Sequence, residues 1–167
     1  MTNAPKNRQT RLDAADRERL CADLERTILS DIPLARAMQV RIGAYDGASL
    51  ALAAALAPNV NDKGCAFGGS LTSLMTLAGW GLVKLALDAR DTDCDIYVRD
   101  SRVRYLAPVW HDFGAVARLA DGETFEGLFQ GLGARGKARI DVCCRVPLED
   151  AADAATFSAS FVAIARR

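Results

Sequence analysis

The segment NDKGCAFGGSLTSLMTLAGWGLVKLALDA, residues 61–89, decides the fold of this chain. It opens as a polar turn up to Gly69 and continues as an apolar run whose only charges, Lys84 and Asp88, lie near its end. This pattern predicts a helix from Gly68 to about Ala89 that is apolar around most of its circumference and must be wrapped by other structure. The unpaired N–H groups and partial positive charge at its start can hold a carbonyl oxygen as negative charge develops on it.

Composition indicates a soluble globular protein. The 167 residues include 21 basic and 21 acidic ones, so nothing in the net charge attracts the chain to nucleic acid or to acidic membranes. Five cysteines, without the spacing of a metal site or a disulfide framework, favour a reducing compartment. The N-terminal residues lack the apolar segment of a secretory signal. We therefore expect a cytoplasmic protein without a bound metal.

The uncharged residues 64–83 are long enough to cross a bilayer. They nevertheless contain five glycines and four serines or threonines, and the opening turn shortens the helical part. A central helix inside a soluble domain explains the same pattern. We expect no membrane span.

The elements around this helix indicate the fold class. Leu20, Leu24 and Ile28, spaced by four within residues 12–30, predict an amphipathic helix that Pro33 ends. Strands are expected at 38–45, 49–57, 96–109, 113–119, 137–146 and 156–165, with a short helix within 123–134. This order predicts an α+β domain in which an antiparallel sheet of about five to six strands wraps around one long helix. We expect a helical extension over residues 1–31 and a single domain over 32–167.

Strand periodicity also predicts which side chains share a face. Cys143 and Cys144 are expected on opposite faces of their strand, which argues against chelation. Asp100 and Arg102 are expected on the same face as Val98 and form either a surface ion pair or part of a site.

Gly131 to Gly136 spell G-x-G-x-x-G, but this stretch precedes a strand, whereas the dinucleotide fingerprint follows one. We interpret the match as chance and expect a flexible loop there.

The order of elements resembles the hotdog fold of acyl-CoA thioesterases and dehydratases. Three segments are similar to the thioesterase family named after the C-terminal domain of the bacterial protein YiiD: NDKGCAFGGSLTSLMTLAGW (61–80), VRYLAPV (103–109) and RGKARI (135–140). They occur in the right order, and the resemblance covers roughly residues 32–166. It implies a homodimer or a dimer of dimers, because hotdog sites usually lie between two subunits.

The resemblance also implies a site. Many hotdog thioesterases carry an Asn, a Gly and a His-Gly-Gly, with an acidic residue further along the helix, and Asn61, Gly64, Gly68 and Gly69 match this frame. Two positions depart from it. Phe67 stands where the His would be, and Thr76 falls near the position of the acid. Neither side chain is a general base near pH 7.

A mechanism follows from this frame as a hypothesis. The thioester carbonyl points at the N–H groups around Gly68 or Gly69, Asn61 orients the carbonyl or a water, and Asp62 or Thr76 positions the attacking water. In the plainer interpretation, Asn61 and Asp62 form the turn and cap before the helix, and the Thr76 hydroxyl bonds back to its own helix.

The resemblance suggests a place for the phosphates of the substrate. Arg135, Lys137 and Arg139 form a basic cluster that can meet the phosphates of CoA or of a carrier protein, or that is only a solvated strand face. CoA or phosphopantetheine enters as part of the substrate, and no separate cofactor is expected. A nucleophilic pair of Cys65 with the single histidine, His111, would require contact that nothing in the sequence predicts.

Three functions are compatible with these residues. The first is hydrolysis of acyl-CoA or acyl-carrier-protein thioesters. The second is non-hydrolytic acyl-thioester binding or acyl transfer in fatty-acid metabolism, which the residues at positions 67 and 76 favour. The third is a hydratase or dehydratase on the same fold, which ranks last because the motif has no His.

Overall fold

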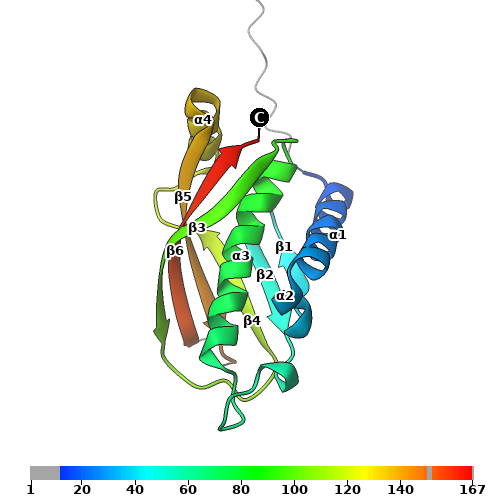
Figure 1. Cartoon of the computed structure of the whole chain (residues 1–167), viewed down its shortest axis with the longest axis vertical. Helices are drawn as coiled ribbons and strands as arrows, with labels where there is room; N and C mark the ends of the chain where they lie inside the picture. The colour runs from blue at the N-terminus through cyan, green and yellow to red at the C-terminus, as the bar shows by residue number, and fades with distance from the viewer. Residues whose placement is uncertain (1–11, 150–151, 167) are drawn as a thin grey trace, which may run out of the picture.

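The computed structural model describes residues 12–149 and 152–166, and in it a six-stranded sheet curls around one long helix (Figure 1). Residues 1–11, which open the expected N-terminal extension, lie outside the described part. Along the chain the elements are α1 (Ala14–Asp31), α2 (Pro33–Ala37), β1 (Arg41–Tyr45), β2 (Ser49–Ala54), the 3-10 helix η1 (Ala57–Asn59), α3 (Gly68–Asp88), β3 (Cys94–Tyr105), β4 (Phe113–Leu119), α4 (Phe125–Arg135), β5 (Lys137–Pro147) and β6 (Asp153–Ala165). The expected α+β class, with an antiparallel sheet around a central helix, is confirmed.

The central helix α3 is buried on most sides. A Cβ added at Gly79 would lie 2.9 Å from the ring of Phe161 on β6, and one at Gly81 would lie 2.8 Å from Leu50 on β2. Both glycines therefore let the sheet approach the helix backbone directly. Among the described residues α3 has the length and composition that would also suit a membrane span, but 61% of its most apolar window is buried inside the protein. Its apolar surface is covered by the fold itself.

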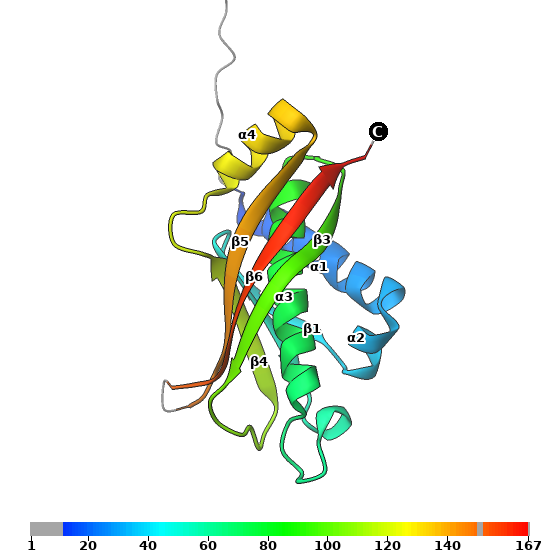
Figure 2. The ribbon, with the colours of Figure 1, turned by 60° about the vertical axis from the view of Figure 1, so that its left-hand side comes forward.

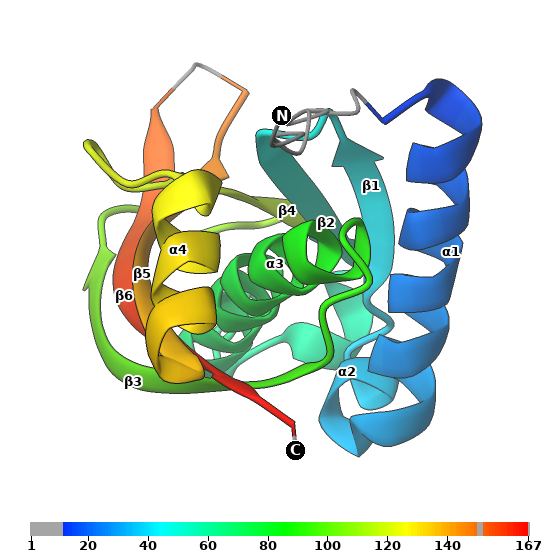
Figure 3. The ribbon, with the colours of Figure 1, turned by 90° about the horizontal axis from the view of Figure 1, so that it is seen from above.

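The sheet has the order β1-β2-β4-β5-β6-β3, and each neighbouring pair is antiparallel. Seen from above, it bends around α3, and α1 lies along the side of β1 (Figure 3). Leu20, Leu24 and Ile28 of α1 are buried, as their spacing predicts. The Glu25 carboxylate accepts a hydrogen bond from the N–H of Ile42 at 3.0 Å, which ties α1 to strand β1 at the edge of the sheet. Strand β3 forms the other edge.

Three strands are shorter than predicted. The strand expected over 49–57 ends at Ala54, before the 3-10 helix η1. The strand expected from residue 38 begins only at Arg41, because Pro33 starts the short helix α2 and Met38 still caps its end. The strand expected to run to residue 109 ends at Tyr105. The next two N–H groups both donate to the carbonyl oxygen of Ala154, at 2.8 and 3.1 Å, and so leave the strand pairing.

The glycine-rich stretch at 131–136 is helical, so the prediction of a flexible loop there is wrong. Most of it forms the last turns of α4, and Gly136 ends that helix in the left-handed conformation with φ 67°. A Cβ at Gly131 would lie 2.8 Å from the Cβ of Ala138, so this glycine lets α4 pack closely on β5. The short helix expected within 123–134 is present as α4, Phe125–Arg135, and it continues through the glycine-rich stretch because Gly131 serves packing there.

A β-bulge at Arg99 interrupts the alternation of β3. Val98 pairs with the buried Phe161, whereas the next paired residue, Asp100, is opposite Ser160. Residues directly opposite each other share a face. Val98 therefore lies on the α3 side of the sheet and Asp100 and Arg102 on the outer side, which corrects the prediction that all three share one face.

The two adjacent cysteines lie on opposite faces, as predicted. Cys143 is exposed on the outer side of β5, and Cys144 is buried against α3, where its thiol donates to the carbonyl oxygen of Met75 at 3.3 Å. Burial raises the pKa of the Cys144 thiol to about 12. Only Cys143 of this pair is accessible to solvent.

Candidate functional site

The N-terminus of α3 presents three backbone N–H groups, those of Gly68, Gly69 and Ser70, that find no hydrogen-bond acceptor among the described residues. The first helical bond runs from the N–H of Leu71 to the carbonyl oxygen of Phe67 at 3.1 Å. Phe67 is the N-cap, with an extended backbone and no side-chain capping bond. The helix start is therefore an open set of donors with a partial positive charge.

The loop before α3 is held by its own hydrogen bonds. The N–H of Asn61 donates to the carbonyl of Cys65 at 2.8 Å, and its side-chain amide donates to the Cys65 sulfur at 3.1 Å. The amide oxygen of Asn61 accepts from the N–H of Lys63 at 2.8 Å. Gly64 turns the chain with φ 84°. The structure thus places Asn61 as the organiser of this loop, with both ends of its amide already engaged.

A buried asparagine that was not predicted from the sequence, Asn59, holds the loop before α3 in place. Asn59 is 2% exposed, and its side-chain amide donates to the carbonyls of Met38 at 2.9 Å and Ala55 at 2.7 Å. Its own carbonyl accepts from the N–H of Phe67 at 2.7 Å, which positions the residue before α3. Its position in the sequence, after Pro58 and just before the polar turn, could have indicated a structural role.

Tyr105 at the end of β3 is a second residue that the sequence reasoning missed. Its hydroxyl lies 2.6 Å from the Thr72 hydroxyl and donates to the carbonyl oxygen of Gly68 at 3.2 Å. A Cβ at Gly68 would meet its ring at 3.2 Å. The tyrosine lies across the first turn of α3, and a small residue at position 68 makes room for it.

Two threonine hydroxyls of α3, those of Thr72 and Thr76, lie one turn apart on the same face of the helix. Thr72 donates to the carbonyl oxygen of Gly68 at 3.1 Å, and Thr76 donates to that of Thr72 at 2.9 Å. Thr76 is half-buried, one turn beyond Thr72. The Thr76 donor is used within the helix, which leaves its oxygen lone pairs free to accept a hydrogen bond from a water.

The carboxylate of Asp62 points into solvent. Its side chain is 78% exposed and pairs with the Lys63 ammonium at 2.8 Å. Phe67, at the position of the expected His, is 55% exposed, and a Cβ at Gly69 would lie 2.3 Å from its ring. In this arrangement the ring of Phe67 covers part of the start of α3. The Asp62 carboxylate lies on the solvent side of the loop.

The predicted basic cluster lies far from the start of α3 within one chain. Arg135 ends α4, Lys137 and Arg139 begin β5, and this end of the molecule is opposite the loop that precedes α3 (Figure 2). The 21 residues of α3 separate the two ends by about 30 Å. Arg139 pairs with Asp141 at 3.6 Å.

Cys65 and His111 do not form a pair. Cys65 is buried and receives the Asn61 amide, whereas the exposed His111 ring nitrogen lies 2.7 Å from the carbonyl oxygen of Asp112. Among residues 12–149 and 152–166, no three His, Cys, Asp or Glu side chains converge as metal ligands do.

An antiparallel sheet wrapped around a helix, with an open helix start beside a glycine pair, defines a protein of the hotdog class. The chain belongs to the family described as "Putative thioesterase (yiiD_Cterm)", whose model matches residues 21–165. The match begins inside α1 and includes the whole candidate site.

Solved structures agree with this assignment. A "putative thioesterase" from Shewanella oneidensis is 32% identical, with a TM-score of 0.78 over 88% of this chain and 99% of that one. A protein "with unknown function" from Chlorobaculum tepidum TLS is 27% identical, with a TM-score of 0.84 over 90% and 97%. A "Probable Thioesterase" from Pseudomonas aeruginosa, at 21% identity and a TM-score of 0.74 over 87% and 95%, shows likeness of fold alone.

Proposed function

We propose that this protein hydrolyses acyl-CoA or acyl-carrier-protein thioesters at the N-terminus of α3. The observation that carries the proposal is the set of three N–H groups at residues 68–70 that have no acceptor in the described part of the chain, in a member of a thioesterase family. Donors fixed at a helix start stabilise the negative oxygen that forms when a water attacks a thioester carbonyl. CoA or phosphopantetheine then leaves as the thiol, and we place the reaction in the cytoplasm.

The surroundings of these donors suit an acyl chain. The loops on either side are joined where the N–H of Ala66 donates to the carbonyl oxygen of Val109 at 2.8 Å. Five large apolar side chains from these loops and their flanks are exposed: Val60, Phe67, Tyr105, Leu106 and Trp110. Such a concentration of exposed apolar side chains marks a binding surface.

In the proposed mechanism the carbonyl oxygen accepts from the N–H of Gly68 or Gly69. The attacking water lies at the same end of α3 and is not held by Thr76 of the same chain, because Thr76 is eight residues, about 12 Å, further along the helix. Asp62 is the carboxylate of the loop and takes the proton of that water. It reaches the site by leaving Lys63. Asn61 acts through the loop, because both ends of its amide are already engaged there.

Thiol release from a panel of short- to long-chain acyl-CoAs and acyl-carrier proteins tests this proposal. We expect turnover in the wild type, and a decrease of about 100-fold or more in Asp62→Ala, the usual contribution of a general base. Asn61→Ala is expected to lose activity together with thermal stability, because it loosens the loop. Asp121→Ala, which removes an exposed carboxylate from another turn, is the matched control and should keep full activity.

The alternative function is acyl-thioester binding or acyl transfer without hydrolysis. The ring of Phe67 against Gly69 and the outward ion pair of Asp62 favour it, because they leave the helix start without a base in contact. This function predicts no thiol release from any substrate, together with a rise in melting temperature when an acyl thioester is added. That result would contradict the hydrolytic proposal.

We also propose that the protein is a homodimer paired through β3. Among the strands that the structure describes, this strand of 12 residues pairs only with β6, so its outer edge is open there, and Tyr97 and Val98 are exposed on it. Open edges pair readily with other strands. An antiparallel pairing of two β3 strands would bring the beginning of one strand beside the end of the other, next to the start of α3.

Light scattering measures the assembly directly. We expect about twice the 17.9 kDa mass of one chain, or about four times for a dimer of dimers. A charge placed in the edge by Val98→Lys should return the mass to that of one chain. Leu34→Lys, at an exposed apolar position on α2, should leave the assembly intact. A monomeric wild type would contradict the pairing.

A further inference from the structure

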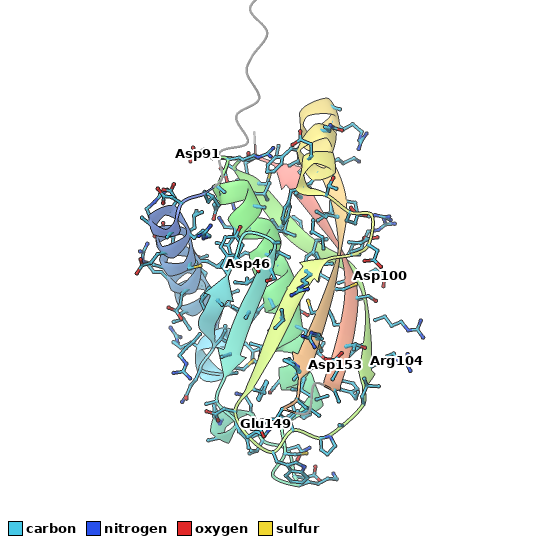
Figure 4. The ribbon with its side chains drawn as sticks, turned by 180° about the vertical axis from the view of Figure 1, so that it is seen from behind. Asp46, Asp91, Asp100, Arg104, Glu149 and Asp153 are labelled. Carbon is cyan, nitrogen blue, oxygen red and sulfur yellow. The ribbon has the colours of Figure 1, made fainter. Side chains whose placement is uncertain are left out.

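A hollow on the outer face of the sheet, opposite α3, is lined by four arginines. The strand register places Arg118, Cys143, Ser158 and Arg102 in one row across β4, β5, β6 and β3. The next row is Val116, Arg145, Thr156 and Arg104. Figure 4 shows this outer face, with Arg104 at the β3 edge and Asp153 near the start of β6.

The hollow has a simple steric origin. The first row carries the short side chains of Cys143 and Ser158 between Arg118 and Arg102. In the second row the short Thr156 lies between Arg145 and Arg104. Directly opposite residues lie about 5 Å apart, so the arginines form walls around a floor of small residues. The resulting cavity has a volume of about 540 Å³.

The charges of the hollow are unbalanced. Among the described residues its lining holds four arginines and one carboxylate, Asp153, which pairs with Arg145 at 3.2 Å. The pKa of the Asp46 carboxyl is lowered mainly by hydrogen bonds from the N–H groups of Ala48 and Ser49. The nearby positive charge of Arg118 lowers it further. Arg102 and Arg104 form no hydrogen bond or ion pair with another described side chain. The lining therefore carries an excess of positive charge that a ligand can neutralise.

We propose that this hollow, the arginine pocket, binds the phosphate groups of a nucleotide-type organic anion. Guanidinium groups form paired, charge-assisted hydrogen bonds with phosphate oxygens, and several of them around one cavity suit a ligand with more than one phosphate. Val116 and the Thr156 methyl group provide an apolar floor for the organic part. A second copy of the same face is a poor occupant, because arginines would then face arginines.

The pocket is separate from the proposed thioester site. The sheet lies between them, since Cys143 faces outward while its neighbour Cys144 contacts α3. Binding here is therefore measured without reference to hydrolysis, and its failure would leave the proposed function untouched.

Cys143 supplies a direct readout, because it is the exposed thiol on the floor of the pocket. The rate of its alkylation by iodoacetamide, followed peptide by peptide in a mass spectrometer, reports occupancy. Cys144 serves as an internal control, since burial keeps its pKa near 12 and its thiol unreactive at neutral pH. We expect pyrophosphate, ADP, ATP or S-methyl-CoA to slow alkylation of Cys143 by about tenfold at saturation, while sodium chloride of equal ionic strength does not.

The comparison among ligands identifies the source of the phosphate. Protection by S-methyl-CoA but not by ADP or ATP assigns the pocket to the nucleotide part of CoA. Equal protection by ADP and ATP assigns it to free nucleotides, and protection by pyrophosphate shows that the phosphates suffice. Each of these outcomes supports an organic or inorganic phosphate as the bound group.

Charge-matched variants complete the test. Arg102→Gln with Arg104→Gln should abolish protection, whereas Arg41→Gln with Arg99→Gln, two exposed arginines outside the pocket, should retain it. Calorimetric titration with the same ligands detects binding that does not protect the Cys143 thiol from alkylation. The proposal is overturned if neither method detects binding, if salt alone protects Cys143, or if the double variant at 102 and 104 binds as well as the wild type.

Discussion

Gly68→Pro is expected to lower the turnover number for thioester hydrolysis by about 100- to 1,000-fold, the usual effect of losing one donor to the oxyanion. Proline removes the N–H at the first position of α3 but is compatible with the backbone there. That position makes no intrahelical N–H bond, and proline is favoured in it. The preceding residue, Phe67, already has the extended conformation, with ψ 132°, that a following proline requires.

Gly68→Ala is the matched control for this substitution. It adds the same Cβ, which would lie 3.2 Å from the ring of Tyr105, but keeps the N–H. We expect it to retain most of the activity, with thiol release measured on both variants and their folding checked by circular dichroism. Equal losses in the two variants would show that crowding against Tyr105 matters and the donor does not. Full activity in both would remove this N–H from the mechanism.

Phe161→Ala should destabilise the protein by about 3–5 kcal/mol, the usual result of deleting a fully buried aromatic side chain. The Phe161 ring is fully buried, and Gly79 of α3 lies directly against it. The cavity would open at the contact between the central helix and β6, where the rigid sheet and helix relax only partly. Urea unfolding monitored by circular dichroism measures the difference in the free energy of unfolding.

Ile164→Ala provides the control on the same strand. Ile164 is 42% exposed on the outer face of the sheet, so its truncation is expected to cost less than about 1 kcal/mol. Gly79→Ala tests the same contact from the helix side, because its Cβ would come within 2.9 Å of the Phe161 ring. We expect it to cost about 1–3 kcal/mol by overpacking. Similar losses from Phe161→Ala and Ile164→Ala would contradict a core centred on this contact.

The central helix and the turn before it were predictable because their signals are local. The apolar run after Gly69 has the length of one helix, and α3 spans Gly68–Asp88, within one residue of the predicted end. Strand β4 has the predicted bounds, Phe113–Leu119, since alternation and turn signals surround it closely. The family resemblance rested on the same kind of local segments and is confirmed by the match over residues 21–165.

The side-chain geometry of the site was less accessible to sequence reasoning. Asn61, Asp62, Gly68, Gly69 and Thr76 all lie in the loop and helix that were expected to carry them. Which way they point depends on contacts made elsewhere in the chain. The Asn61 amide closes its own loop, and the Asp62 carboxylate is turned to Lys63.

Long-range pairing explains the remaining differences. Tyr105 reaches Gly68 only because β3 returns along α3, and the bulge at Arg99 sets which β3 side chains face the helix. The arginine pocket exists because β5 and β6 lie between β4 and β3 in the sheet. No local stretch of sequence predicts this strand order.

Local pattern alone was therefore enough to establish the central helix, its open N-terminus and the class of fold, because hydrophobic periodicity and turn residues act over a few neighbours. Only the tertiary structure determined three features: the residues that contact that N-terminus, the open edge at β3 and the charged hollow on the outer face. All three features depend on contacts between distant parts of the chain. They bring together residues far apart in the chain through strand order, register and one extra residue in a strand.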